Sequence, residues 1–178
     1  SLKTPLDVVF LGEKGVGKTS LLIQFLDSKY ARVDGATTML KMDGRSVECH
    51  FRESPEDYCD ADLVIICFDL TNEESFEKAK ARLESLDEEL RSEPVVALVG
   101  TKLDLHIKKK VSEKEVEALA GDMGAYYAAV SYNGFGVYDL FRELVGLCFD
   151  KLPAPDEACV FMTVKDVSFM EAFSKLFW

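Results

Sequence analysis

The residues best suited to chemistry lie near the start of the chain, in the run GEKGVGKTS at residues 12–20. Glycines leave backbone N–H groups free to turn onto phosphate oxygens, while Lys18 supplies a full positive charge and the Thr19 hydroxyl is a ligand for Mg²⁺. The pattern G-x-x-x-x-G-K-[ST] is a Walker A loop, and it favours nucleotide binding over a glycine-rich turn that binds nothing. The candidate contacts in this loop are Gly12, Lys14, Gly15, Val16, Gly17, Lys18, Thr19 and Ser20, with Thr19 as the metal ligand.

A second candidate group follows an apolar run much later in the chain. Residues 94–99 (PVVALV) predict a buried strand, and TKLDL follows at residues 101–105. A carboxylate at the carboxyl end of a parallel strand lies where such sheets bind ligands. Asp104 can accept two hydrogen bonds from the N1–H and 2-amino groups of guanine, a donor pair that adenine lacks. Alone, the segment fits an Asp-capped turn better, but beside a Walker loop it predicts guanine contacts from Thr101, Lys102, Asp104 and Leu105.

The segments around these motifs predict the elements that position them. The apolar run at residues 7–11 predicts a buried strand directly before the loop, and residues 21–26 predict a helix directly after it. Asp43-Gly44 between two alternating runs is typical of a hairpin turn. A further apolar run at residues 63–68 predicts another strand, and residues 134–150 predict the last helix of the domain. Strand, loop and helix therefore occur in the order that phosphate binding requires.

Composition narrows the kind of protein that carries these motifs. The chain has 178 residues, enough for one domain with a real core, and a formal net charge of −11. This acidic balance argues against sequence-independent nucleic-acid binding and against attraction to anionic lipid. No apolar run approaches the roughly 20 residues of a membrane span, and the start SLKTP is unlike a signal peptide. Five cysteines without a C-x-x-C pair indicate reduced thiols, so we expect a cytoplasmic protein.

The order of the motifs resembles the Ras superfamily of small GTPases, nearest to its Rab and Rho branches, over about residues 6–150. The resemblance rests on the Walker loop, on TKLD (with the Thr that Rho members use in the family's N-K-x-D), on FDLTNEESF at 68–76 and on VSEKEVEALA at 111–120. It implies GDP or GTP as ligand, Mg²⁺ as cofactor and protein effectors as partners. No nucleic acid is expected among the partners.

The resemblance also implies contacts to the base that fit less closely. Ser131 matches the first residue of the family's S-A-K, whereas Tyr132 and Asn133 replace Ala and Lys. A backbone N–H contact survives such side-chain changes, but the bulk of Tyr132 crowds the base and lowers the expected affinity. Tyr30 stands where the family carries an aromatic beside guanine, and it equally fits a partly buried aromatic at the end of the first helix.

The fold implied by the resemblance is an α/β P-loop NTPase G domain over residues 1–152. We expect a six-stranded, mostly parallel sheet flanked by helices, with the nucleotide at the carboxyl edge of the strands. Residues 153–178 predict a proline-containing linker and an apolar, aromatic, amphipathic helix from residue 160. This helix packs on the domain, on a neighbouring copy or on a partner. No prenyl anchor is expected within residues 1–178, because they contain no C-terminal cysteine box.

The strongest departures from the family lie in its two switch regions. The first switch is short, because residues 30–38 lead almost directly into the hairpin; Thr38 is expected in a strand, and Thr37 is either a strand residue or a Mg²⁺ ligand. In the second, Glu53, Glu56 and Asp57 take the places of the Asp, Gly and Gln of the family's DxxGQ motif. Too few residues remain before the next strand for the usual switch helix.

These departures predict slow or absent GTP hydrolysis. The family's Gly donates to the γ-phosphate and its Gln orients the attacking water, whereas Glu56 places a carboxylate at the Gly position. Glu53 is one methylene longer than the Asp that holds a Mg²⁺-bound water. Lys14 obstructs an incoming arginine finger, adds a cation near the γ-phosphate, or equally is a solvated lysine of the loop. No residue is therefore assigned as catalytic.

The sequence fits two hypotheses about function. In the first, the protein is a Rab-like GTPase that binds GDP or GTP with Mg²⁺. In the second, it is a pseudo-GTPase interaction domain, either by itself or as one unit of a larger protein. The intact Walker loop and Asp104 favour the first, and the reduced switches favour the second. An ordinary membrane-cycling Rab is disfavoured, because its effectors would read switches that this chain hardly has.

Overall fold

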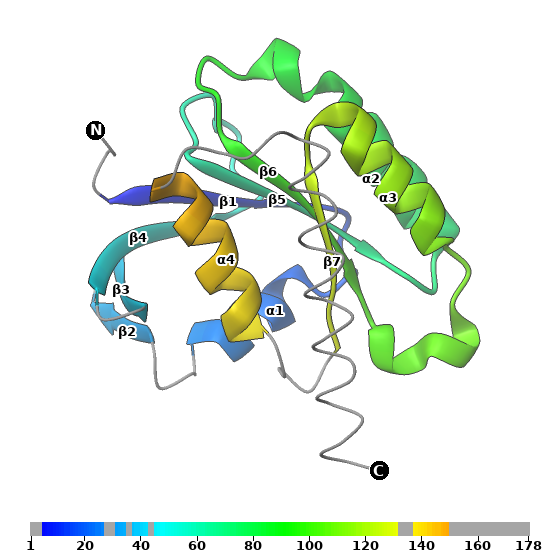
Figure 1. Ribbon diagram of the computed structural model, residues 1–178, viewed down its shortest axis with the longest axis horizontal. Coiled ribbons are helices and arrows are strands. Elements are labelled where there is room, and N and C mark those ends of the chain that lie inside the picture. Colours follow the sequence, from blue (N-terminus) through cyan, green and yellow to red (C-terminus); the bar gives the residue numbers. More distant parts are fainter. Residues whose placement is uncertain (1–4, 27–30, 35–36, 43–44, 132–136, 150–178) are drawn as a thin grey trace.

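The computed structural model describes residues 5–26, 31–34, 37–42, 45–131 and 137–149. These residues form one sheet with the strand order β2-β3-β4-β1-β5-β6-β7 (Figure 1). Its strands are β1 (Leu6–Leu11), β2 (Ala31–Asp34), β3 (Thr37–Met42), β4 (Arg45–Glu53), β5 (Leu63–Asp69), β6 (Val95–Thr101) and β7 (Tyr126–Ala129). All neighbouring pairs from β4 to β7 are parallel, and β2 and β3 add antiparallel pairs at one edge.

The predicted mostly parallel sheet is confirmed, with one strand more than the six expected. The additional strand is β2, which pairs with β3 from Ala31↔Leu40 to Asp34↔Thr37. The reason is that the short segment after the first helix finds hydrogen-bond partners at the free edge of the hairpin instead of looping across the site. Thr37 and Thr38 both lie in β3, so the strand interpretation holds for each.

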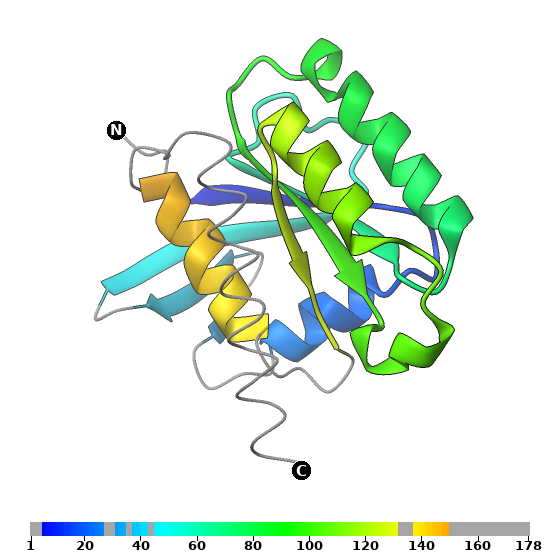
Figure 2. The same cartoon turned by 45° about the vertical axis from the view of Figure 1, so that its right-hand side comes forward.

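Four helices of the described chain cover the two faces of the sheet. Figures 1 and 2 show α1 and α4 together on one face and α2 and α3 on the other. Their bounds are α1 (Lys18–Leu26), α2 (Glu73–Glu89), α3 (Glu113–Met123) and α4 (Val137–Phe149), and a short 3₁₀ helix, η1 (Leu103–Lys108), follows β6. Among the described helices, none combines the length and apolar character needed to cross a membrane. The linker and aromatic helix predicted from residue 153 onward lie outside the described residues.

The core forms two layers because successive strand residues face opposite sides of the sheet. In β5 every residue is buried, as expected for a central parallel strand that is covered on both faces. Its Ile65 belongs to the layer under α1 and α4, where Phe25 and Phe141 stack with ring centroids 4.0 Å apart. Its neighbour Ile66 belongs to the layer under α2 and α3. This double cover fixes the parallel strands so that their carboxyl ends meet at one edge.

Candidate functional site

The loop between β1 and α1 needs glycine for two different reasons. Gly12 has a φ of +144°, and a Cβ on it would lie 2.5 Å from the carbonyl oxygen of Cys67 in β5. Gly15 has a φ of +85° but open space around it, so only its backbone conformation favours glycine. The loop is therefore pressed against β5 at its start and open toward solvent at its middle. This shape leaves room for phosphate groups against the backbone, which a side chain would take up.

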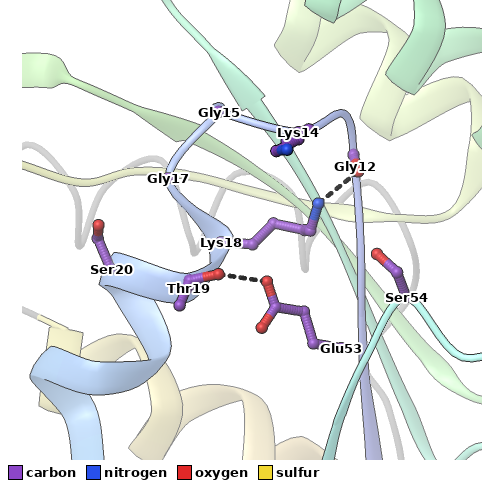
Figure 3. A pocket seen from close by; sticks show the side chains of 9 residues that line it. All are labelled: Gly12, Lys14, Gly15, Gly17, Lys18, Thr19, Ser20, Glu53 and Ser54. Carbon is purple, nitrogen blue, oxygen red and sulfur yellow. Dashed lines mark hydrogen bonds between the residues drawn. The ribbon is translucent and has the colours of Figure 1, made fainter.

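Lys18 holds the loop around its own ammonium group. It is the first residue of α1 and is only 8% exposed. Its Nζ donates to the carbonyl oxygens of Gly12 (2.5 Å) and Glu13 (3.2 Å), as Figure 3 shows for Gly12. The predicted phosphate-binding lysine is thus buried, oriented and placed at the amino end of a helix, where the partial positive charge of the helix adds to its own.

Thr19 and Glu53 meet across the pocket from two distant segments. The Thr19 hydroxyl at the start of α1 donates to Glu53 Oε1 at the end of β4 over 2.5 Å (Figure 3). Glu53 stands there because β4 runs parallel to β1 with Phe10 opposite Glu53. Hydroxyl and carboxylate oxygens are hard ligands of the kind that Mg²⁺ prefers. The donor set therefore fits a Mg²⁺ ion held jointly with phosphate oxygens.

These groups line one pocket of about 530 Å³. Its walls come from the loop, the first turn of α1 and the end of β4, all at the carboxyl edge of the sheet. Seven of the predicted contacts line this pocket, together with Glu53, the last residue of β4, and Ser54, which follows it. The lining residues are Gly12, Lys14, Gly15, Gly17, Lys18, Thr19, Ser20, Glu53 and Ser54. Val16, also predicted, is buried in the core layer beneath the loop instead. Its backbone oxygen still takes part in the site, because it lies within hydrogen-bond distance of the Thr101 hydroxyl.

Thr101 and Lys102 fasten the end of β6 to the loop. Thr101 is buried, and its hydroxyl lies within hydrogen-bond distance of the backbone oxygens of Val16 and Phe68. Lys102 has a φ of +63°, and its Nζ donates to Asp69 Oδ2 (2.5 Å) and to the Gly15 oxygen (3.4 Å). The two predicted residues therefore support the phosphate loop from below.

Asp69 is a residue of this site that sequence reasoning missed. Burial raises the pKa of its carboxyl, but hydrogen bonds from Lys102 and Thr71 outweigh burial and hold the pKa below its usual value. The carboxylate thus stays ionised and positions Lys102 under the loop. A signal was present, since Asp69 ends the buried strand β5 just as Asp104 follows β6.

The residues predicted to contact the base are described only in part. Asp104 and Leu105 lie exposed in the first turn of η1, whose Leu103 N–H donates to the Val130 oxygen over 3.1 Å. This bond joins the start of η1 to the end of β7, where Ser131 is buried. Asp104 and Ser131 are therefore brought to the same edge of the sheet. Tyr30, Tyr132 and Asn133 lie outside the described residues, and their contacts stay a prediction.

The segment that replaces the second switch leaves the pocket at once. Residues 54–62 contain no helix, as expected from their number. Ser54 lines the pocket and Glu56 is not among its lining residues, so the placement of the Glu56 carboxylate beside the phosphates stays a prediction. Asp57 accepts the N–H of Cys59 (3.1 Å), and its backbone oxygen accepts from Arg52, which also binds Asp7 in β1. Because Arg52 binds both Asp7 and the Asp57 oxygen, the chain runs from the pocket toward the start of β1.

Comparison with known proteins places the chain in a family. A family model described as the Ras family matches residues 7–55 and 50–149. Ras-related protein Rab-21 of Canis lupus familiaris is 30% identical, in a match covering 77% of this chain and 70% of that protein. Rab-21 of Homo sapiens is also 30% identical, and Rab-21 of the sponge Geodia cydonium is 31% identical, over 77% of this chain in each case and 69% and 68% of the relative. The chain therefore belongs to the Ras family and is a divergent, Rab-like small GTPase of the guanine-nucleotide-binding type.

Proposed function

We propose that this protein is a cytoplasmic, guanine-nucleotide-binding protein that takes up GDP and GTP with Mg²⁺ and hydrolyses GTP very slowly. One observation carries the proposal: the buried Lys18 ammonium and the Thr19–Glu53 pair line the same pocket, which the second-switch segment leaves after Ser54. We assign the binding unit to residues 1–152, as the sequence predicts.

The pocket suits a nucleoside di- or triphosphate residue by residue. The Lys18 ammonium attracts the β- and γ-phosphates, and backbone N–H groups of the open loop at Gly15 donate to phosphate oxygens. Thr19 would ligate Mg²⁺, and Glu53 would hold a water bound to the ion, as the shorter Asp at this position does in the family. Bound Mg²⁺ neutralises charge between the terminal phosphates.

Guanine selectivity comes from the other end of the same edge. Asp104 accepts from the N1–H and 2-amino groups of guanine, while Thr101 and Lys102 keep β6 against the phosphate loop. Leu105 lies beside Asp104 in the same turn. Ser131 follows β7, the strand that pairs with β6. By resemblance, Tyr30, Tyr132 and Asn133 complete the contacts to the base.

Slow hydrolysis follows from what the second-switch segment can offer the attacking water. Small GTPases orient that water with a glutamine, and the glutamine position here is Asp57. The Asp57 carboxylate instead accepts the Cys59 N–H, and Arg52 binds its backbone oxygen at the far edge of β1. Within the described residues that line the pocket, no side chain is a glutamine, so water orientation falls to bulk solvent.

The first test identifies the nucleotide that the purified full chain carries. Denaturing the protein and separating the released compounds by chromatography is expected to give about one GDP or GTP per chain. Recovery of GTP would also demonstrate slow turnover. A pocket that stays empty after incubation with Mg²⁺ and excess GTP would overturn the proposal. It would favour the scaffold function, which draws on the fixed contacts of residues 54–62 with Asp7 and Arg52.

A matched pair of variants tests the base. In Asp104→Asn, one carboxylate acceptor becomes an amide donor, which matches the 2-oxo group of xanthine better than the 2-amino group of guanine. We expect this variant to prefer xanthosine diphosphate to GDP. Asp122→Asn is the control, because it makes the same chemical change at an exposed residue of α3. Equal GDP affinity in both variants would show that Asp104 does not read the base.

A further inference from the structure

Ser54 has a backbone conformation that its side chain makes costly. Its φ is +45°, in the left-handed region that glycine adopts freely and residues with a Cβ adopt rarely. It directly follows Glu53 at the end of β4, and its N–H donates to the Phe10 oxygen over 2.8 Å. This bond fixes the backbone of Ser54 at the pocket. Its N–H is therefore not available to bind a ligand. Strained residues that persist in this way are found preferentially at ligand clamps.

The side chain of Ser54 is oriented into the nucleotide pocket. Figure 3 shows it on the wall opposite the loop, with its hydroxyl pointing toward the side of the pocket that holds the Lys18 ammonium. Within the described part of the chain, the Ser54 hydroxyl makes no hydrogen bond. A glycine would remove the strain at this position, whereas serine keeps it and presents a donor to the pocket. The strain and the donor together point to a ligand.

The position of Ser54 in the pocket indicates which part of the nucleotide it meets. Mg²⁺ in P-loop proteins bridges β- and γ-phosphate oxygens, and Thr19 with Glu53 marks that point here. Ser54 is one residue beyond Glu53, on the same wall, and faces the lysine that serves the same two phosphates. The terminal phosphate of a triphosphate would therefore lie between Lys18 and Ser54, and a diphosphate would leave that space to water.

We propose that the Ser54 hydroxyl donates a hydrogen bond to the γ-phosphate of GTP and so sets a preference for triphosphate over diphosphate. This inference rests on the proposed nucleotide binding and deepens it. It assigns to a side-chain hydroxyl the discrimination that the family's glycine N–H provides; the residue at that position here, Glu56, is not among the residues that line the pocket. Because Ser54 is already fixed to β1, the contact forms without movement of the residues that follow it.

The test compares two substitutions that share the loss of the hydroxyl but differ in backbone strain. Full-length Ser54→Ala and Ser54→Gly proteins, freed of nucleotide, are titrated with fluorescent GDP and with a fluorescent non-hydrolysable GTP analogue. A hydrogen bond to a charged acceptor predicts about a tenfold loss of affinity for the analogue in both variants, with GDP affinity unchanged. Ser54→Gly is also expected to melt at a higher temperature than Ser54→Ala, because the strain is gone. Ser46→Ala, at an exposed serine of β4, the strand that precedes Ser54, is the control.

The outcomes separate this inference from the function on which it rests. Equal affinity ratios of analogue to GDP in wild type and Ser54→Ala would overturn the role of the hydroxyl while leaving nucleotide binding intact. A ratio preserved in Ser54→Gly but lost in Ser54→Ala would assign the effect to something other than the hydroxyl, which both variants lack, and would overturn the inference as well. Failure of the wild-type protein to bind either nucleotide would overturn the proposed function and, with it, this inference.

Discussion

Two regions at the ends of β1 and β4 have diverged in opposite ways. Around the phosphate loop, side-chain contacts converge on the pocket: Lys18 binds the loop backbone, and Lys102 reaches Gly15 from below. In residues 54–62, contacts lead away from it, toward Asp7 at the start of β1 and toward the residues after α2. The comparison teaches that binding a nucleotide and responding to it depend on separate parts of this fold. Here only the first part has kept the contacts that its task requires.

The second-switch segment is held by packing and by backbone hydrogen bonds. Tyr58 is 6% exposed in the core layer under α2, and its hydroxyl bonds to Glu89 and to Arg82 (3.0 Å) of that helix. The Cys59 oxygen accepts the N–H groups of Arg91 (2.8 Å) and Ser92 (3.1 Å). A segment with a buried aromatic anchor and satisfied backbone groups opens rarely. It is thus a fixed part of the surface.

The largest effect is expected from Lys18→Ala, which breaks the phosphate side of the comparison. Removing a buried, hydrogen-bonded charge from its partner costs about 4 kcal/mol, roughly a thousandfold in GDP affinity. Titration with fluorescent GDP measures it, and Lys114→Ala, at an exposed site on α3, serves as the control. The buried core should stay folded in this variant, and hydrogen exchange of its amides checks this. Affinity within threefold of wild type would mean that phosphate is bound elsewhere.

Tyr58→Ala breaks the other side, and its effect falls on folding. Loss of a buried aromatic ring and its two hydrogen bonds is expected to lower the free energy of unfolding by about 3 kcal/mol, whereas Tyr58→Phe, which keeps the ring, costs about 1 kcal/mol. Urea unfolding of both variants provides the measurement. GDP affinity of Tyr58→Phe should equal that of wild type. A large loss of GDP affinity in that variant would show that the two regions are coupled after all.

Sequence patterns were sufficient for the elements whose cause is local. The alternation around Asp43-Gly44 predicted the β3–β4 hairpin, and the Walker run predicted a loop between a strand and a helix. The strand β2 was missed because its four residues, ARVD, have no apolar pattern of their own and become a strand only by pairing with β3. An edge strand of this kind is a consequence of tertiary structure.

The candidate site was predictable where a residue's role depends on its own motif. Lys18, Thr19 and Thr101 lie where the motifs place them. Asp69 was missed because its role depends on the pairing of β5 with β6, which sets Asp69 opposite Thr101. The positions of Glu56 and Asp57 were counted as if the chain continued along the family's path. Arg52 and the burial of Tyr58 redirect it, and neither interaction is visible in the spacing of residues.

Alkaline pH is expected to act on both regions through groups buried in their neutral forms. Burial raises the pKa of Cys67, beneath the phosphate loop, and of Tyr58 to about 12 each. Cys49, Tyr126 and Cys148 are raised to about 12 by burial as well. Between pH 9 and 12 the unfolded chain has lost these protons and the folded chain retains them, so stability falls as pH rises.

Urea unfolding at pH 8 and pH 10.5 measures this fall, and a variant assigns part of it. In Tyr58→Phe one titrating group is absent, so the decrease between the two pH values should be smaller than in wild type. Cys59→Ser removes another titrating group of the same segment, whose pKa is raised by its hydrogen bond to Asp57, so its decrease should also be smaller than in wild type. Wild-type stability that is flat over this range would mean that these groups ionise without opening the core.

The smallest effect is expected where relatives with complete switches should differ most, in residues 54–62 between the GDP and GTP states. The Ser54, Ala61 and Asp62 N–H groups donate to the backbone oxygens of Phe10, Tyr58 and Asp7, and none of these acceptors belongs to the nucleotide loop. A ligand shifts a conformational equilibrium only by its differential affinity for the two states, and a hydroxyl contact at the fixed Ser54 favours neither. Hydrogen exchange of these amides should therefore be the same with GDP and with a GTP analogue, while residues 12–20 gain protection from either nucleotide relative to the empty protein. A large difference confined to residues 54–62 would mean that this segment, despite its anchors at Tyr58 and Cys59, still senses the γ-phosphate.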